Sequence, residues 1–133
     1  MSITVKNSLL SNETISALNT LVELDINASC AFKLMRIIKE VSSIVEDKLK
    51  MERRILEKWV EKDESGNIVE VKDESGNIVD GAVNITDVDS FTQEMQNLME
   101  VENEIPYDRI EFEELNLKTA KVKDLIKLEF LFS

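Results

Sequence analysis

The stretch that decides the fold runs from residue 28 to residue 62 and reads ASCAFKLMRIIKEVSSIVEDKLKMERRILEKWVEK. It contains neither glycine nor proline, and its apolar residues recur with a helical period, which predicts one long amphipathic helix. At ~1.5 Å per residue this helix would be about 50 Å long. A compact domain of this mass has a smaller diameter, so we expect part of the helix to project. The apolar stripe consists of Leu34, Ile37, Ile38, Val41, Ile44, Val45, Leu49, Met51, Ile55, Leu56 and Trp59.

Two shorter elements are predicted before the long helix. Ile3 and Val5 alternate with polar neighbours, which indicates a short strand near the N-terminus. Asn12 or Ser11 then caps a helix that continues to about Leu24. The apolar residues of that helix lie on one face, so it should pack on the core.

Another helix is expected after residue 89, where Ser90 and Gln93 form the pattern of a capping box. It should continue to about Glu102, and its narrow apolar seam suits antiparallel packing on the long helix. The seam consists of Val88, Phe91, Met95 and Leu98.

The C-terminal part predicts one more strand and one more helix. Ile110 and Phe112 alternate with glutamates, which indicates a strand that could pair with the N-terminal strand. Thr119 begins a helix that is apolar on most sides and ends in residues 130–132, which read FLF. We expect this end to be buried in the domain or in an oligomer interface.

An exact internal repeat follows the long helix. The sequence KDESGNIV occupies residues 62–69 and recurs at residues 72–79. Asp, Ser, Gly and Asn are turn residues, and glycine supplies the positive φ that tight hairpins require. Two interpretations fit: two consecutive turns joining three short strands (58–62, 67–72 and 77–80), or one hairpin with the second copy looped out.

These elements predict a single α+β domain over residues 1–133 that is mostly helical. The long helix packs on a shorter antiparallel helix. A small β-hairpin or meander, inserted over about residues 60–82, lies at its tip. A short terminal strand pair completes the fold.

Composition excludes several classes of function. The chain has 16 basic and 27 acidic residues, a net charge of −11, and no histidine. The negative charge disfavours binding to nucleic acid phosphates, and the missing histidine excludes Ser-His or Cys-His catalysis and histidine-ligated metals. The single cysteine, Cys30, cannot form an internal disulfide. No signal peptide and no membrane span are predicted, so we expect a cytoplasmic protein.

The acidic residues are concentrated in the second half of the chain. Residues 61–114 contain three bases and seventeen acids, whereas residues 1–60 contain nine bases and eight acids. Such an imbalance favours encounter with a basic surface, and turns commonly carry function. We therefore predict partner contacts at Asp63, Glu64, Asp73, Glu74, Glu100, Glu102 and Glu104, with Trp59 and Arg53 as further candidates.

Metal binding is a weaker interpretation of the same acids. Asp63 and Glu74 fall at the first and last positions of a calcium loop, but Ile68 stands where that loop requires glycine. The acids of residues 100–114 could hold Mg²⁺, yet nothing in their spacing selects a pair. Turn residues and a solvated acidic surface are favoured, so we predict no metal, no cofactor and no catalytic residue.

Several stretches together carry a resemblance to a known family. They are A-x-K-L-x-x-I-I-K at residues 31–39, the D-E-S-G-N-I-V turns, F-x-x-E-x-x-x-L-M-E-x-E at 91–102 and D-L-I-x-L-E-F-L at 124–131. In this order the chain resembles a family of small proteins of phages and prophages of Gram-positive bacteria. The resemblance implies a phage origin and a location in the host cytoplasm, and it carries over no functional residue.

The expected function is a phage-encoded, non-catalytic binding protein. Through its acidic surface it would inhibit or sequester a host factor, either a defence protein or a nucleic-acid-processing enzyme. The alternative is a virion morphogenesis factor, such as a tail-assembly chaperone or a minor structural protein. The expected partner is a host protein with a basic surface, without direct nucleic acid or membrane binding. The projecting helix and apolar tail also predict self-association, with a dimer favoured.

Overall fold

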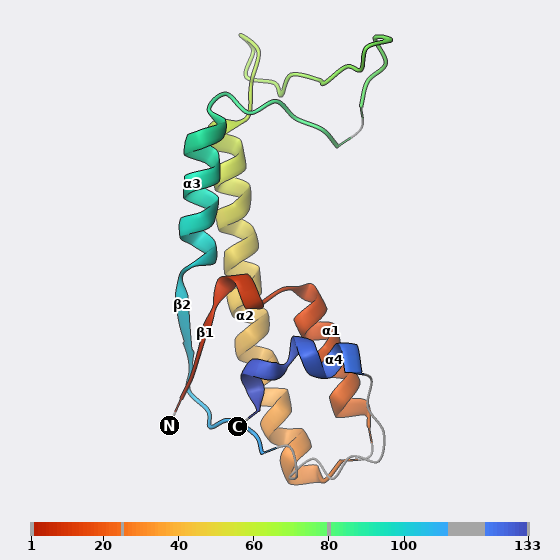
Figure 1. The fold of residues 1–133 in the computed structure, drawn as a ribbon, viewed down its shortest axis with the longest axis vertical. Coiled ribbons are helices and arrows are strands. Elements are labelled where there is room, and N and C mark those ends of the chain that lie inside the picture. The colour runs from red at the N-terminus through yellow and green to blue at the C-terminus, as the bar shows by residue number, and fades with distance from the viewer. Residues whose placement is uncertain (1, 25, 80, 112–121, 133) are drawn as a thin grey trace. The chain divides into compact units, whose positions relative to one another are not determined.

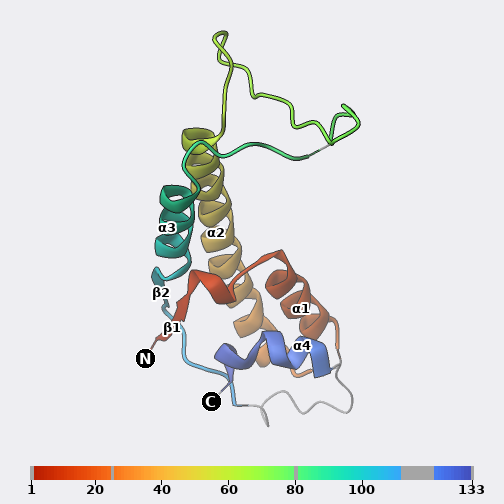
Figure 2. The same ribbon diagram turned by 45° about the horizontal axis from the view of Figure 1, so that its top comes forward.

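The computed structural model describes residues 2–24, 26–79, 81–111 and 122–132 (Figures 1 and 2). The fold is α+β and mostly helical, as the sequence predicts, with a long helix packed on shorter helices and a two-stranded antiparallel sheet. In chain order, the described elements are β1 (Ile3–Lys6), the 3-10 turn η1 (Asn7–Leu9), α1 (Asn12–Glu23), α2 (Ala28–Trp59), α3 (Val88–Met99), β2 (Glu102–Ile105), α4 (Val122–Lys127) and the 3-10 turn η3 (Glu129–Leu131).

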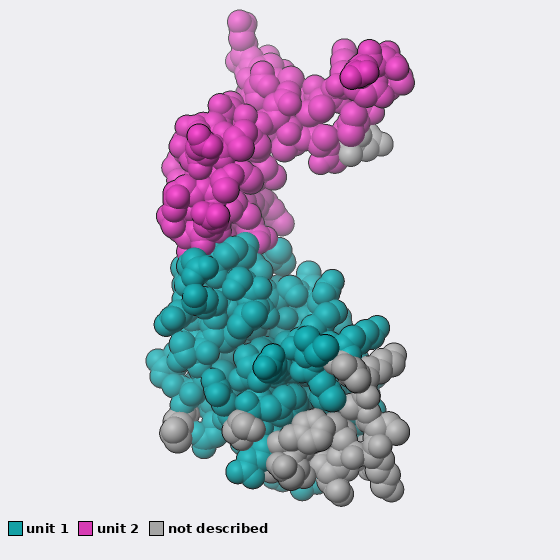
Figure 3. Space-filling model, viewed as in Figure 1, with its two compact units in different colours: residues 1–49, 99–133 teal, residues 50–98 magenta. Residues whose placement is uncertain are grey.

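The chain divides into two compact units, which Figure 3 draws in different colours. Unit 1 comprises residues 1–49 and 99–133, and it contains the sheet, α1 and α4. Unit 2 comprises residues 50–98, and it contains nearly all of α3 and the connection from α2 to α3. Helix α2 contributes residues to both units.

The long helix α2 begins and ends on specific hydrogen bonds. The side-chain oxygen of Asn27 accepts the backbone N–H of Cys30 at 3.0 Å, which caps the first turn. At the other end, the carbonyl of Trp59 accepts two bonds from Thr86, one from its backbone N–H (2.8 Å) and one from its hydroxyl (3.0 Å). The returning chain therefore satisfies a terminal carbonyl and fixes the end of α2 three residues before the predicted position.

The apolar core of unit 1 is built around the first part of α2. The buried stripe on this helix recurs at three- and four-residue intervals, as expected for one helix face. Helices α1 and α4 lie against each other (Figures 1 and 2). Ile38 and Ile44 are only partly buried, and Phe32 and Met35 are exposed. The fully buried core includes Ile3, Leu10, Leu18, Leu34, Ile37, Val41, Ile105, Ile110, Leu128 and Leu131.

The strand pairing differs from the prediction. Strand β1 pairs antiparallel with β2, with Ile3 opposite Ile105, instead of with the residues around Ile110. Asn103 explains why an acidic stretch forms this strand. Its side-chain amide donates to the carbonyl of Val5 (3.2 Å) and to the side-chain oxygen of Asn7 (2.7 Å). Helix α3 ends at Met99 rather than near Glu102, which frees these residues for the sheet.

Of the predicted second strand, the structure describes residues 110 and 111, and Ile110 forms an isolated contact. Ile110 forms a parallel bridge with Phe132, and its N–H donates to the carbonyl of Leu131 at 2.9 Å. Phe112, the other predicted residue of that strand, lies outside the described residues, as does Thr119. The bridge still anchors the segment, because Ile110 is fully buried.

The apolar C-terminal tail is covered by its own chain. Leu131 is fully buried, and Phe130 and Phe132 are partly buried against the core of unit 1. The sequence predicts burial of the tail either in the domain or in an oligomer interface, and the structure shows burial in the domain. One of the two reasons for expecting self-association is therefore removed.

Helix α3 begins earlier than predicted, and its cap is a different residue. The helix starts at Val88, and Asp87 accepts the backbone N–H of Ser90 (3.1 Å) and the Ser90 hydroxyl (2.8 Å) on its two carboxylate oxygens. These bonds hold the pKa of Asp87 below its ordinary value. The predicted Ser90–Gln93 capping box is wrong, because Ser90 lies inside the first turn and Gln93 bonds to Asn97 instead. Val88, at the helix start, is exposed.

Candidate functional site

Residues 60–86 connect α2 to α3 within unit 2, and we refer to them as the hairpin insertion. Its two ends are joined by an antiparallel bridge between Val60 and Ile85 and by a hydrogen bond from the N–H of Glu61 to the carbonyl of Asn84 (2.8 Å). Together with the Thr86 bonds to Trp59, these contacts close the base of the insertion. The described residues between 62 and 83, which are 62–79 and 81–83, therefore belong to a loop whose two ends are held together.

Each copy of the repeat forms its own hairpin. In the first, Lys62 bridges Ile68, the N–H of Asp63 donates to the carbonyl of Asn67 (2.8 Å), and Gly66 donates back to Asp63 (3.0 Å). The second copy repeats this pattern ten residues later, with the same two distances. The arrangement matches the interpretation with two turns, although the pairing consists of isolated bridges instead of continuous strands.

Glycine is required at the same position of both turns. Gly66 has φ of 84° and Gly76 has φ of 83°, the left-handed region that other residues rarely adopt. A side chain would meet no neighbouring atom at either site, so the requirement comes from the backbone alone. The two hairpins thus have the same backbone geometry as well as the same sequence.

The four predicted hairpin acids have two different roles. Asp63 accepts the N–H groups of Ser65 (2.9 Å) and Asn67 (3.0 Å) on one carboxylate oxygen, and Asp73 makes the equivalent bonds in the second copy (both 2.9 Å). This is the Asx-turn pattern, in which the side chain holds the turn. Glu64 and Glu74 are exposed at the turns, and no contact of either is resolved within the described part of the chain.

The turn bonds also bear on the calcium-loop interpretation. One Asp63 oxygen is already occupied by two backbone donors, and the geometry is that of a hairpin and not of a ligand loop. Across residues 2–24, 26–79, 81–111 and 122–132, no three Cys, Asp or Glu side chains are placed to hold a metal ion.

Apolar side chains accompany the exposed glutamates. Ile68 and Ile78, which close the two hairpins, are 52% and 54% exposed, and Val79 is exposed as well. The insertion carries two lysines and seven acids between Val60 and Thr86. Each hairpin therefore offers the same small surface, one carboxylate and one isoleucine on a negatively charged background.

Trp59 is engaged at the base of the insertion and is not a free anchor. Its indole N–H donates to Glu94 of α3 at 2.7 Å, and the other Glu94 oxygen lies 2.7 Å from the ammonium of Lys58. These bonds, first that of Lys58 and then that of Trp59, lower the pKa of Glu94 below its ordinary value. Arg53 is exposed on α2. The Trp59 ring therefore helps to join α2 to α3.

The remaining predicted acids belong to unit 1, where Glu102 and Glu104 lie in β2 and Glu100 lies just before it. Glu100 forms an ion pair with Lys6 at 2.7 Å, which raises the pKa of Lys6, and Glu104 accepts the hydroxyl of Ser2 at 2.7 Å. Glu102 lies opposite Lys6 in the strand register. These residues lie next to residues in or just before β1, so they are weaker candidates for partner binding than Glu64 and Glu74.

Comparisons of the chain with models of protein families, with curated proteins and with solved structures find no match. None of the helices formed by the described residues combines the length and apolar composition that crossing a bilayer requires. The fold and the hairpin insertion are therefore the basis for any statement about function.

Proposed function

We propose that the chain is a non-catalytic binding protein that engages a basic surface on a host protein through its hairpin insertion. The observation that carries the proposal is the duplicated hairpin. Two identical turns display Glu64 with Ile68 and Glu74 with Ile78, and all four side chains are exposed. Exposed acid and apolar side chains that recur in two copies of one turn support association with another macromolecule.

Charge supports a basic partner. The insertion carries seven acids against two lysines, and charge of one sign steers an oppositely charged surface into encounter. Exposed carboxylates contribute little to folding, so their repetition is better explained by association than by stability. The exposed isoleucines would add apolar contact once the partner has docked.

The resemblance to phage and prophage proteins suggests what the partner is. A bacterial host factor with a basic groove fits the acidic insertion best, either a defence protein or a nucleic-acid-processing enzyme. An acidic loop in such a groove would exclude the natural ligand. No observation on the fold favours the alternative, a role in virion assembly.

The test begins with a pull-down from host lysate and continues with the purified partner. The double variant Glu64→Gln with Glu74→Gln should slow association and flatten its dependence on salt, because two steering charges are lost. The matched control is Glu23→Gln with Glu57→Gln, which removes two exposed charges outside the insertion. Equal association rates for all three proteins across a salt series would contradict the proposal. So would turnover of nucleotides or phosphoesters by the pure protein.

A further inference from the structure

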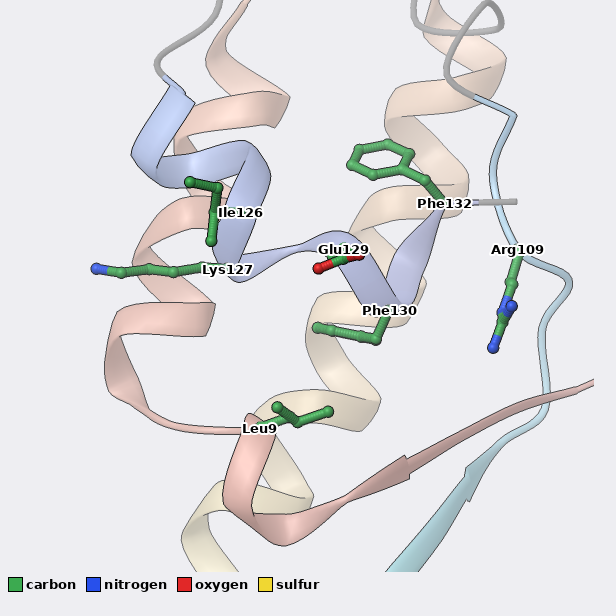
Figure 4. A pocket seen from close by; sticks show the side chains of 7 residues that line it. All are labelled: Leu9, Arg109, Ile126, Lys127, Glu129, Phe130 and Phe132. Carbon is green, nitrogen blue, oxygen red and sulfur yellow. The ribbon is translucent and has the colours of Figure 1, made fainter.

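A pocket of about 430 Å³ lies in unit 1, on the side formed by the C-terminal turn η3. Its volume falls within the range of small-molecule sites. Figure 4 shows Ile126 and Lys127 on one side of the view, Arg109 on the other, and Phe130 and Phe132 between them, with Leu9 at the edge. Glu129 completes the lining. The pocket shares no residue with the hairpin insertion, so it is independent of the proposed function.

The pocket combines an apolar wall with exposed apolar side chains. Phe130 and Phe132 are partly buried against the core, which holds them in place. Leu9 and Ile126 are 57% and 66% exposed, among the most exposed large apolar residues of the described chain. An apolar group seated between them would remove this surface from water, which is favourable at roughly 25 cal/mol per Å².

The charges in the lining are not equivalent. The ammonium of Lys127 is 2.9 Å from the carboxylate of Glu13 and is neutralised by it. Arg109 lines the pocket and forms no ion pair with any of the described residues. The Glu129 carboxylate is also at the pocket and disfavours a second negative charge on a ligand.

We propose that this pocket binds an apolar monocarboxylate. The planar guanidinium of Arg109 presents two parallel N–H donors that match a carboxylate, and the apolar wall takes the rest of the ligand. Every ligand of this class has one carboxylate attached to one branched or aromatic apolar group. Such a group occurs in a free organic acid and in the C-terminal residue of a peptide.

The experiment titrates the full chain with phenylacetate and isovalerate by calorimetry. Phenylacetamide, which has the same shape without the charge, and phenylphosphonate, which carries more charge, are the comparison ligands. Both acids should bind more tightly than either comparison ligand. Arg109→Gln should weaken phenylacetate binding roughly 10- to 100-fold, the loss of a charge-assisted pair. The matched control, Lys123→Gln, removes an exposed cation of α4 that does not line the pocket and should bind as the wild type does.

A second variant tests the apolar wall, and a peptide tests the source of the ligand. Leu9→Ala changes an exposed side chain, so the fold should persist while affinity falls several-fold. A short peptide with a free C-terminal leucine should also bind, and its amidated form should not. Tighter binding of the peptide than of isovalerate would assign the site to a chain terminus, and weaker binding to a free acid. Equal binding of amide and acid, unchanged affinity in Arg109→Gln, or no binding of either acid at millimolar concentration would overturn the proposal.

Discussion

Two neighbouring acidic residues of the same charge have different environments in this protein. Asp63 turns its carboxylate back onto two backbone N–H groups, whereas Glu64, one residue later, leaves its carboxylate in water. The aspartate side chain is short enough to reach the backbone two residues on, and glutamate is one methylene too long for the same turn. The structural role of Asp63 and the proposed interaction role of Glu64 are therefore separable by single substitutions.

The first prediction uses the second hairpin as an internal control. Asp63→Ala removes the acceptor of the Ser65 and Asn67 N–H groups, so hydrogen exchange at these two amides should accelerate. Asp63→Asn keeps a side-chain oxygen and should preserve most of their protection. Ser75 and Asn77, which bond to Asp73 in the same molecule, should be unchanged in both variants. Unchanged exchange at Ser65 and Asn67 in the Ala variant would show that the Asp63 side chain does not hold the turn.

The second prediction concerns pH and Glu94. Lys58 and Trp59 lower the pKa of this carboxyl from its ordinary value of 4.5, so they stabilise its charged form in the folded protein. Its contribution to stability is complete above pH 4.5 and is lost as the pH falls through the lower, folded-state pKa. The stability difference between wild type and Glu94→Gln should therefore shrink in acid, which melting curves at neutral and acidic pH will measure. A difference that is constant with pH would contradict this assignment.

The Gln variant isolates the charge from the hydrogen bond. A glutamine oxygen can still accept the indole N–H of Trp59, whereas Glu94→Ala would leave this half-buried donor without its partner. The alanine variant should therefore be the less stable of the two at every pH.

At the scale of the element, local patterns predicted helices better than strand partners. The period of apolar residues places α1 and α2 to within a few residues, because each helix closes its hydrogen bonds within itself. The pairing of β1 depends on residues about a hundred positions away, and the helix predicted to continue to about Glu102 included the first residue of β2. The contacts of Asn103 with Val5 and Asn7, together with the burial of Ile105, show why that stretch becomes a strand.

The third prediction tests the packing of the C-terminal turn. Leu131 is fully buried, so Leu131→Ala should reduce the free energy of unfolding by about 2–5 kcal/mol through lost contacts and a cavity. Ile126→Ala removes a similar side chain that is mostly exposed, and its effect should stay within about 0.5 kcal/mol. Denaturant unfolding measures both. Similar losses in the two variants would mean that the tail is not part of the core.

At the scale of the molecule, the sequence shows the acidic insertion but not the pocket. The charge imbalance and the repeat are continuous in sequence, so they can be found by counting. The pocket gathers Leu9, Arg109 and residues 126–132, which only the fold brings together. Arg109 is a lone base within an acidic stretch, and its isolation is the one signal that could have marked it.

Self-association stays a prediction, and the C-terminal tail no longer supports it. With the tail buried in its own core, the exposed apolar residues Phe32 and Met35 of α2 are its main support in unit 1. Light scattering at micromolar concentration should give twice the chain mass of 15.2 kDa if these residues form an interface. Phe32→Ser with Met35→Ser should then restore the single-chain mass. A mass of 15.2 kDa for the unmodified protein would contradict the prediction.

The repeated hairpin has a consequence for how this protein can change in length. Each copy is self-contained, because its turn bonds and its positive-φ glycine lie within eight residues. Deleting residues 67–76 joins Gly66 to Asn77 and leaves one intact copy with no foreign junction. Duplicating the same ten residues adds a third copy equally cleanly. The insertion should therefore tolerate the gain or loss of ten residues at a time, whereas a change of another size within residues 63–67 or 73–77 would disrupt a turn.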